Sequence, residues 1–264
     1  MSDAEIKSPR IRAVPAVTRA IAILRLLSHN RTPMTLKAIA EALELVPSTA
    51  LHIARALVAE RLVQVDPQTK RYRLGVGMLP LARAVLANSD FPTLVQPRLD
   101  ALSARYGATA IGVELPDLDN MIVVALSRSQ VPVHIHVDVG SRFPALISAT
   151  GRCLAAFTEQ PWKEIERRFR SLRWDDAPSY DVWQKEVALT RRQGFSIDRG
   201  NYIAGVTIVA VPVLNGRGRI SHTLASVGLS SQLDRAKSLA LAKDMRVAAD
   251  EIGAQLAQQP CACV

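Results

Sequence analysis

Four polar residues are predicted to share one face of a helix that begins at Pro47. Their hydroxyl, imidazole and guanidinium groups donate or accept hydrogen bonds, which is the chemistry needed to read base edges in the major groove of DNA. These residues are Ser48, Thr49, His52 and Arg55. An ordinary amphipathic helix that turns its polar face to water would show the same pattern, so the neighbouring elements have to decide between the two interpretations.

A basic hairpin is predicted directly after this helix. Two strand-like runs flank residues 66–70, whose Asp-Pro-Gln-Thr-Lys sequence is typical of a turn. Alternation along the second run places Tyr72 and Leu74 inward and the two arginines that alternate with them outward, where they could contact phosphates. The residues predicted to hold phosphates are Lys70, Arg71 and Arg73.

Two shorter helical patterns precede Pro47, and apolar residues recur in all three patterns at steps of three and four. Thr35 stands at the N-cap position of the second pattern, where its hydroxyl can accept from a free backbone amide. Three helices followed by a hairpin predict a winged helix-turn-helix, which presents a helix to the DNA major groove. The residues predicted to face the core are Val17, Ala20, Ile21, Leu24 and Leu27, then Leu36, Ile39, Ala40 and Leu43, then Ala50, Ile53, Ala54 and Leu57.

The positive charge of the chain is concentrated near its N-terminus. Residues 1–90 contain thirteen Lys or Arg and seven Asp or Glu, a net charge of +6, whereas residues 91–264 contain twenty and seventeen, a net charge of +3. Concentrated positive charge is expected of a surface that contacts phosphates. Lys7, Arg10 and Arg12 precede the first helix and could form a basic arm, or equally a solubilising tail.

Length and composition are those of an ordinary globular protein. The chain has 264 residues, 48% of them apolar and 22% charged, which suffices for a small domain and a larger one. No apolar run approaches the ~20 residues that a membrane helix needs, and the first residues lack the hydrophobic stretch of a secretory signal. The three cysteines favour no disulfide framework. We therefore expect a cytoplasmic protein with no membrane partner.

Three consecutive parts are predicted: a basic arm and winged helix-turn-helix domain over residues 1–76, a linker helix within residues 77–91, and a second domain over residues 92–264. An amphipathic helix opens the second domain and ends at Gly107, a typical C-cap. Beyond it strands are separated by helices, which predicts an α+β fold around one sheet. The linker helix is predicted over 78–87, strands over 109–114, 121–126, 133–137, 207–214 and 220–227, and helices over 148–159, 162–170, 180–193 and 232–257.

Several segments of the second domain, together with the winged helix-turn-helix, resemble the IclR-type bacterial transcriptional regulators. These segments are FPALISATGRCLAAF (143–157), RRQGFSIDRGNYIAGVTIVAVPV (191–213) and ISHTLASVGL (220–229). The resemblance implies a winged-helix DNA-binding domain joined by a linker helix to a GAF-like α/β effector-binding domain. It also implies a homodimer, often paired into a tetramer, on a roughly palindromic operator.

The resemblance further implies that the effector is a small organic acid from a catabolic pathway. Ala149 and Thr150 fall where backbone amides meet the ligand carboxylate, and a helix N-terminus favours an anion there. Asp198 falls at an acidic position of the pocket.

One branch of the family, the glyoxylate-sensing regulators, has Cys and Ser at three positions that are apolar here. These positions are Ile208, Ala225 and Val227. The substitutions predict a ligand with a larger apolar body, such as an aromatic or alkyl carboxylate. Alternatively, the three residues simply pack the sheet.

Three further groups of residues could carry chemistry. Cys153 could be a redox or metal-sensing thiol, or a buried structural cysteine. His134 and His136 share a face of a predicted strand, but they lack an adjacent third metal ligand. Cys261 and Cys263 lie in a C-terminal tail, which could fray, capture metal or oxidise.

Motifs of common enzyme classes are missing from the sequence, which has no nucleophile elbow, no GxxxxGK[ST] and no HExxH. Gly216 and Gly218 lie between two predicted strands, as in a hairpin turn. We therefore expect no catalytic residue, metal site or cofactor. The alternative that stays open is a small-molecule-metabolising enzyme, or a metal or redox sensor, with an appended DNA-binding domain.

Overall fold

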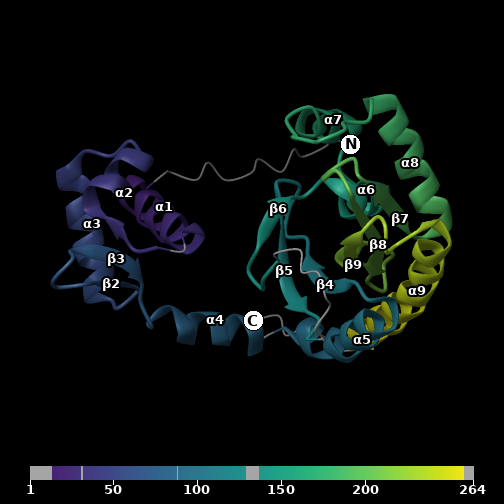
Figure 1. Ribbon diagram of the computed structural model, residues 1–264, viewed down its shortest axis with the longest axis horizontal. Helices are drawn as coiled ribbons and strands as arrows, with labels where there is room; N and C mark the ends of the chain where they lie inside the picture. The colour runs from purple at the N-terminus through teal and green to yellow at the C-terminus, as the bar shows by residue number, and fades with distance from the viewer. Residues whose placement is uncertain (1–13, 31, 88, 129–136, 259–264) are drawn as a thin grey trace, which may run out of the picture. The chain divides into compact units, whose positions relative to one another are not determined.

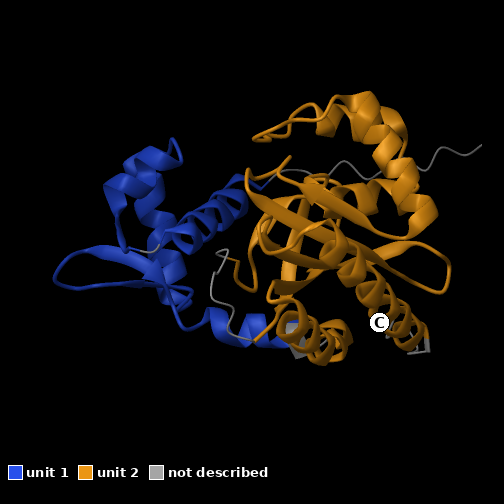
Figure 2. Cartoon of the chain, turned by 45° about the vertical axis from the view of Figure 1, so that its right-hand side comes forward, with its two compact units in different colours: residues 1–88 blue, residues 89–264 orange. Residues whose placement is uncertain are grey.

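The computed structural model describes residues 14–30, 32–87, 89–128 and 137–258. The chain forms two compact units, residues 1–88 and 89–264 (Figure 1 and Figure 2), and each has its own hydrophobic core. Some residues singled out above lie outside the described part of the chain, so the expectations for them stay predictions. They are Lys7, Arg10, Arg12, His134, His136, Cys261 and Cys263.

The first unit is a winged helix-turn-helix followed by a further helix, as the sequence predicts. Two local signals set where its helices begin. The Thr35 hydroxyl accepts a hydrogen bond from the Ala38 amide at 3.2 Å, and Pro47 occupies the first turn of the third helix. The elements are α1 (Pro15–His29), β1 (Met34–Thr35), α2 (Leu36–Ala42), α3 (Pro47–Ala59), β2 (Val63–Val65), β3 (Arg71–Leu74) and α4 (Met78–Ala87).

Helix α1 buries a different face from the predicted one. Ile23 and Leu27 are buried, whereas Val17 and Ile21 are 55% and 42% exposed. The helix is apolar around most of its circumference, so its period alone does not select a face. The face of α1 that is buried is the one that packs against α3 and β3. The predicted stripe was therefore wrong at Val17 and Ile21, while the stripes predicted for α2 and α3 are confirmed.

A short strand that the sequence did not indicate ties the wing to the helices. Strand β1 pairs with β3, so the small sheet has the order β1-β3-β2. The end of the wing also depends on Gly75, whose amide donates to the Leu62 carbonyl at 2.8 Å. A Cβ at Gly75 would lie 2.2 Å from the Arg61 carbonyl oxygen, so only glycine allows this close approach.

The second unit is built on one antiparallel sheet of six described strands in the order β6-β5-β4-β9-β8-β7. The four central strands were predicted, and the two edge strands were not. The predicted strand over 133–137 falls almost wholly outside the described residues. The strands are β4 (Thr109–Glu114), β5 (Asn120–Leu126), β6 (Arg142–Pro144), β7 (Ser196–Arg199), β8 (Val206–Leu214) and β9 (Ile220–Leu229).

Helices cover both faces of this sheet (Figure 1). Helices α5 and α9 pack on one face, and α6, with α7 and α8 beyond it, packs on the other. Gly107 ends α5 in the left-handed conformation, with φ of 66°, which confirms the predicted C-cap. The helices are α5 (Asp90–Tyr106), α6 (Ser148–Phe157), α7 (Trp162–Phe169), α8 (Tyr180–Gln193) and α9 (Arg235–Gln258).

No single helix among the described residues is both long and apolar enough to cross a membrane. Only α2 and α3 taken together reach the required length and composition, and a bend of 114° separates them. That bend is the turn of the helix-turn-helix.

Candidate functional site

The outward face of α3 carries the four residues predicted to read bases. Ser48, His52 and Arg55 are exposed, and Thr49 is half-buried. Positions separated by three and four residues lie on the same side of a helix, so the exposed three form one surface. None of the four side chains makes a hydrogen bond or ion pair with another described residue. Their polar groups are therefore available to an outside partner.

The wing displays the three predicted phosphate-holding cations, all exposed. Arg71 donates through Nη1 to the Pro33 carbonyl oxygen at 3.1 Å, and Arg73 donates through Nη2 to Oε1 of Gln64 at 3.2 Å. Each guanidinium keeps further donors for a phosphate, because arginine has five. The Lys70 ammonium makes no hydrogen bond or ion pair with a described residue, so it is available to an anion.

Asp66 fixes the shape of the wing tip. Its Oδ1 accepts the amides of Gln68 and Thr69 at 2.9 and 2.8 Å. These hydrogen bonds hold the pKa of the Asp66 carboxyl below its usual value. Lys70 follows in the left-handed region, with φ of 53°. The wing tip is thus folded into a defined turn before any partner binds.

The second unit contains a small apolar cavity, which we call the inner cavity, between the sheet and the start of α6. Its volume is about 110 Å³. A protein cavity of ~150 Å³ admits a benzene molecule, so this smaller one suits only a compact ligand. Its polar lining residues are Ser148, Thr150 and Tyr202, and its apolar ones are Ile111, Val113, Met121, Val137, Phe143, Ile203, Ile208, Ala225 and Val227.

The N-terminus of α6 reaches the inner cavity through Ser148 and Thr150. No side chain caps this helix, and no described oxygen accepts from the amides of Ala149 or Thr150. A close approach shapes this turn, because a Cβ at Gly151 would lie 2.1 Å from the Leu146 carbonyl oxygen. Free amides at a helix N-terminus attract an anion. The cavity can therefore bind a compact apolar molecule that carries one negative group.

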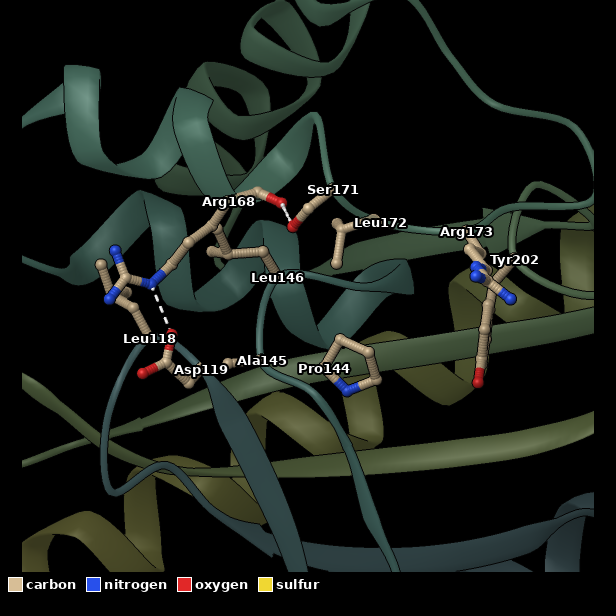
Figure 3. Close-up of a pocket in the computed structure, with 10 residues that line it drawn as sticks. All are labelled: Leu118, Asp119, Pro144, Ala145, Leu146, Arg168, Ser171, Leu172, Arg173 and Tyr202. Atoms are coloured by element: carbon tan, nitrogen blue, oxygen red, sulfur yellow. Dashed lines mark hydrogen bonds and ion pairs between the residues drawn. The ribbon is translucent and has the colours of Figure 1, made fainter. Parts of the chain in front are cut away.

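A second pocket, which we call the outer pocket, has a volume of about 390 Å³ and shares Tyr202 with the inner cavity (Figure 3). The Arg168–Asp119 ion pair lies at one end, with Nε and Oδ1 2.8 Å apart, while Arg173 and Tyr202 lie at the other. The outer pocket is lined by Leu118, Asp119, Pro144, Ala145, Leu146, Arg168, Ser171, Leu172, Arg173 and Tyr202.

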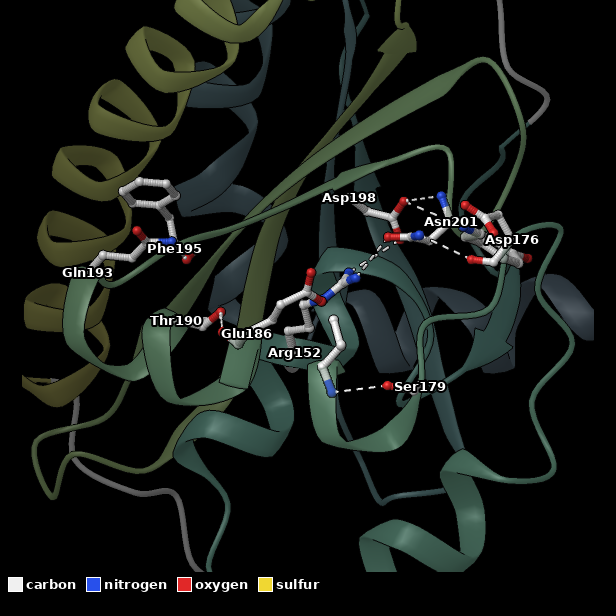
Figure 4. A network of polar contacts seen from close by, with 11 residues as sticks. Arg152, Asp176, Ser179, Glu186, Thr190, Gln193, Phe195, Asp198 and Asn201 are labelled. Atoms are coloured by element: carbon white, nitrogen blue, oxygen red, sulfur yellow. Dashed lines mark hydrogen bonds and ion pairs between the residues drawn. The ribbon is translucent and has the colours of Figure 1, made fainter. Parts of the chain in front are cut away.

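Behind the inner cavity, Arg152 is the centre of a buried polar network (Figure 4). Its guanidinium donates to Glu186 at 2.6 Å, to Asp198 at 3.3 Å and to Asn201 at 3.1 Å. Asp198 also accepts the amides of Asn201 and Tyr202 at 3.0 and 3.4 Å. The network therefore joins α6, which carries Thr150, to the turn that carries Tyr202.

Four of the six residues assigned to the effector by resemblance line the inner cavity, and two do not. Thr150, Ile208, Ala225 and Val227 line the inner cavity. Ala149 is fully buried beside it, where its backbone rather than its side chain is available. Asp198 does not line the cavity, because its carboxylate oxygens are engaged by Arg152 and by backbone amides.

Both units match described protein families. Residues 16–67 match the IclR helix-turn-helix domain, and residues 83–254 match the family described as bacterial transcriptional regulator IclR C-terminal. The second match alone spans more than half of the chain. The chain belongs to the IclR family of bacterial transcriptional regulators. Its members bind operator DNA and small-molecule effectors, and they are regulators rather than enzymes.

Full-length relatives support this assignment. The HTH-type transcriptional repressor AllR of Salmonella typhimurium is 23% identical over 255 residues, covering 94% of this chain and 92% of AllR. The HTH-type transcriptional regulator XynR of Escherichia coli is 26% identical, covering 85% and 90% of the two chains. The crystal structure of an IclR transcriptional regulator from Alicyclobacillus acidocaldarius superposes with a TM-score of 0.81 at 28% identity, covering 92% of this chain and 99% of that one.

Sequence reasoning on this IclR-family chain missed most of the cavity wall. Ile111 lies opposite Ala225 in the β4–β9 pairing, so the two side chains share a face of the sheet. That register could have identified Ile111 once Ala225 was assigned to the ligand, but the pairing is not visible in the sequence. Tyr202 comes from a turn, where no periodicity marks its direction.

Cys153 is fully buried, and its Sγ donates to the Ala210 carbonyl oxygen at 3.4 Å. Burial raises the pKa of this thiol far above its ordinary value, so it stays protonated and unreactive. In the described parts of the chain, no three His, Cys, Asp or Glu side chains lie close enough together to hold a metal ion. These observations favour a structural cysteine.

Proposed function

We propose that this regulator binds a palindromic operator in the cytoplasm as a homo-oligomer, and that a small aromatic or alkyl carboxylate changes its affinity for that operator. The observation that carries the proposal is the inner cavity, which combines apolar walls with the free amides at the start of α6. An apolar body fits the walls, and a carboxylate fits the amides.

The cavity volume narrows the expected ligand class. About 110 Å³ is below the ~150 Å³ of a cavity that binds benzene, so the ligand is a compact acid no larger than benzoate. Burial and the negative charge of Asp175 raise the pKa of Tyr202, so its hydroxyl remains a hydrogen-bond donor at neutral pH. Tyr202, Ser148 and Thr150 therefore add donors to the α6 amides.

Calorimetric titration of the purified chain with benzoate and with glyoxylate tests the ligand class. We expect benzoate to bind more tightly, because glyoxylate leaves the apolar walls unoccupied. Ala225→Leu fills the cavity and should abolish binding, whereas Ala254→Leu on the exposed side of α9 is the control and should leave it intact. Tighter binding of glyoxylate would contradict the proposal.

On the DNA side, α3 would read bases through Ser48, Thr49, His52 and Arg55, and the wing would hold phosphates through Lys70, Arg71 and Arg73. Pull-down of genomic fragments by the purified chain at two salt concentrations tests this. Discrete palindromic sites that survive the higher salt are expected. Diffuse binding that disappears with salt would show phosphate contact alone.

The effector and operator sites are coupled if the regulator works as proposed. By thermodynamic linkage, operator DNA must change the affinity for the acid by the same factor by which the acid changes the affinity for DNA. Repeating the calorimetric titration with the protein bound to operator measures that factor. Equal affinities with and without DNA would mean that the cavity does not regulate DNA binding.

Homo-oligomer formation is supported by exposed apolar side chains in the first unit. Val17 and Ile21 lie one turn apart on α1, Val14 precedes them at the N-cap, and Leu79 and Val85 are exposed on α4. A two-fold dimer places the same patch of each copy against its partner, so a stripe of this kind can cover itself. Burial of such a stripe in a dimer would remove apolar surface from water.

A further inference from the structure

The outer pocket has an apolar floor and an uneven distribution of charge. Leu118, Leu146 and Leu172 contribute apolar surface, while its charged lining residues are Asp119, Arg168 and Arg173. Arg168 is neutralised, because it pairs with both Asp119 and Glu164. Arg173 is exposed and has no hydrogen bond or ion pair with a described residue. The pocket thus offers one uncompensated positive charge.

The inner cavity differs from the outer pocket in charge, since none of its described lining residues is charged. An organic anion that binds there must leave water and cross an apolar boundary, which is costly for a charge without a partner. A cation on the approach side concentrates anions near the boundary and so raises the rate at which they enter. Of the two described cations that line the outer pocket, which adjoins the inner cavity, Arg173 is the one without an ion-pair partner.

Tyr202 is the one lining residue that the inner cavity and the outer pocket have in common among the described residues. Its backbone amide is held by Asp198 at 3.4 Å, but its hydroxyl makes no hydrogen bond with a described residue. The backbone is therefore anchored by a hydrogen bond, whereas the ring is held by packing against the core cluster alone. Rotation of this one side chain would change the boundary between the two spaces.

We infer that the outer pocket is a capture site for small organic anions on their way to the inner cavity, with Arg173 as the attracting cation and Tyr202 as the movable boundary. The inference rests on the proposed role of the inner cavity as the effector site. It assigns a function to a pocket that has none in the proposed DNA-reading and effector-binding roles.

A cysteine placed in the inner cavity tests this without knowledge of the effector. The reporter is Val227→Cys in a chain that also carries Cys261→Ser and Cys263→Ser. Its rate of modification is measured by intact-protein mass spectrometry with two thiol reagents, the anionic 2-sulfonatoethyl methanethiosulfonate and the cationic 2-(trimethylammonio)ethyl methanethiosulfonate. Because both reagents report on the same thiol, its reactivity cancels in the ratio of the two rates.

Arg173→Gln should lower the anion-to-cation rate ratio by about threefold to tenfold, the lower range of electrostatic steering. The difference should shrink at high salt. Arg167→Gln is the matched control, because Arg167 is exposed on α7, pairs with Glu164 and does not line the outer pocket. Tyr202→Ala should raise the rates of both reagents several-fold and leave their ratio unchanged.

An unchanged ratio in Arg173→Gln would overturn the role of Arg173, and unchanged rates in Tyr202→Ala would show that the ligand enters elsewhere. Met121→Cys, also on the cavity wall, is a second reporter if the first destabilises the chain. The outcome is independent of the benzoate titration, so failure of the proposed ligand class and failure of this route are distinguishable.

Discussion

Arg152 and Asp198 form an ion pair inside the second unit, with Nη1 and Oδ2 3.3 Å apart and each side chain only 1% exposed. The second oxygen of Asp198 accepts the amides of Asn201 and Tyr202. Both carboxylate oxygens of Asp198 therefore have hydrogen-bond partners within the protein. In this chain it holds the wall of the inner cavity in place rather than facing into it.

Replacing Asp198 by asparagine should destabilise the second unit. Arg152 would remain buried with only Glu186 as a charged partner, and breaking a buried ion pair costs about 3–5 kcal/mol. Urea denaturation measures the change in the free energy of unfolding. Glu159→Gln removes an exposed pair with Arg219 and should cost less than about 1 kcal/mol. Equal effects of the two substitutions would contradict the structural role of Asp198.

Substitutions on α3 and on the wing should weaken DNA binding in different ways. His52→Ala should relax specificity at one operator position, whereas Arg71→Ala should weaken all sequences and reduce the salt slope of log Kd by about one. Fluorescence anisotropy across a salt series separates the two effects. Arg98→Ala, which breaks a pair with Glu251 in the second unit, is the control. An unchanged slope in Arg71→Ala would remove the wing from the DNA interface.

A charge introduced into the exposed stripe of α1 should dissociate the proposed dimer. Ile21→Glu would place a carboxylate in an apolar contact, where an unpaired charge is strongly unfavourable. Sedimentation velocity should then show a smaller species. Val182→Glu, at an exposed position of α8, is the matched control and should leave the oligomeric state unchanged. A dimer that survives Ile21→Glu would have to use another surface.

Stability should fall as the pH drops from about 6.5 towards 4 because of His222. Burial against Phe91, whose ring stacks on the imidazole at a centroid distance of 4.0 Å, lowers the pKa of His222 to about 4. The unfolded chain therefore binds a proton that the folded chain excludes, and the stability contributed by neutral His222 is present above pH 6.5 and lost below it.

The loss attributable to His222 should be roughly 2–3 kcal/mol at pH 4. Urea denaturation from pH 7.5 to 4 compares the parent with His222→Gln, in which this part of the pH dependence should disappear. His52→Gln, on the exposed face of α3, is the control. Parallel curves for the parent and His222→Gln would show that His222 does not contribute.

Gly151→Ala should disrupt the start of α6. Its Cβ would lie 2.0 Å from the Leu146 carbonyl carbon, so the backbone of the turn must move, at a cost of about 1–3 kcal/mol. The anion-binding amides would move with it, and acid binding should weaken. At Gly216 the nearest atom lies 3.5 Å away, so Gly216→Ala is the control. Thermal melting and calorimetry together measure both effects.

The elements that sequence reasoning found are those with strong local signals. Helix α4 was predicted with its observed bounds, Met78–Ala87, and Thr35 and Pro47 mark the starts of α2 and α3 as expected. The elements it missed are the short strands β1, β6 and β7. A strand of two to four residues is defined by its partner more than by its own composition, so it leaves little trace in the sequence.

The candidate site was predictable to a similar extent. Resemblance identified Thr150, Ala225 and Val227, which line the inner cavity. It could not show that Asp198 is engaged by Arg152, because that contact joins residues 46 positions apart. The outer pocket was not foreseen either, since it is formed where α7 and the loops beside it approach the turn at Tyr202.

The polar residues that hold the inner cavity in place are different from the apolar residues that line it. Arg152, Asp198 and Asn201 support the inner cavity from behind, while Ile208 and Ala225 decide which shapes fit inside it. A substitution in the lining can therefore alter chemical preference without loosening the scaffold. Divergence towards new effectors can proceed one side chain at a time on such a protein, with each intermediate still folded.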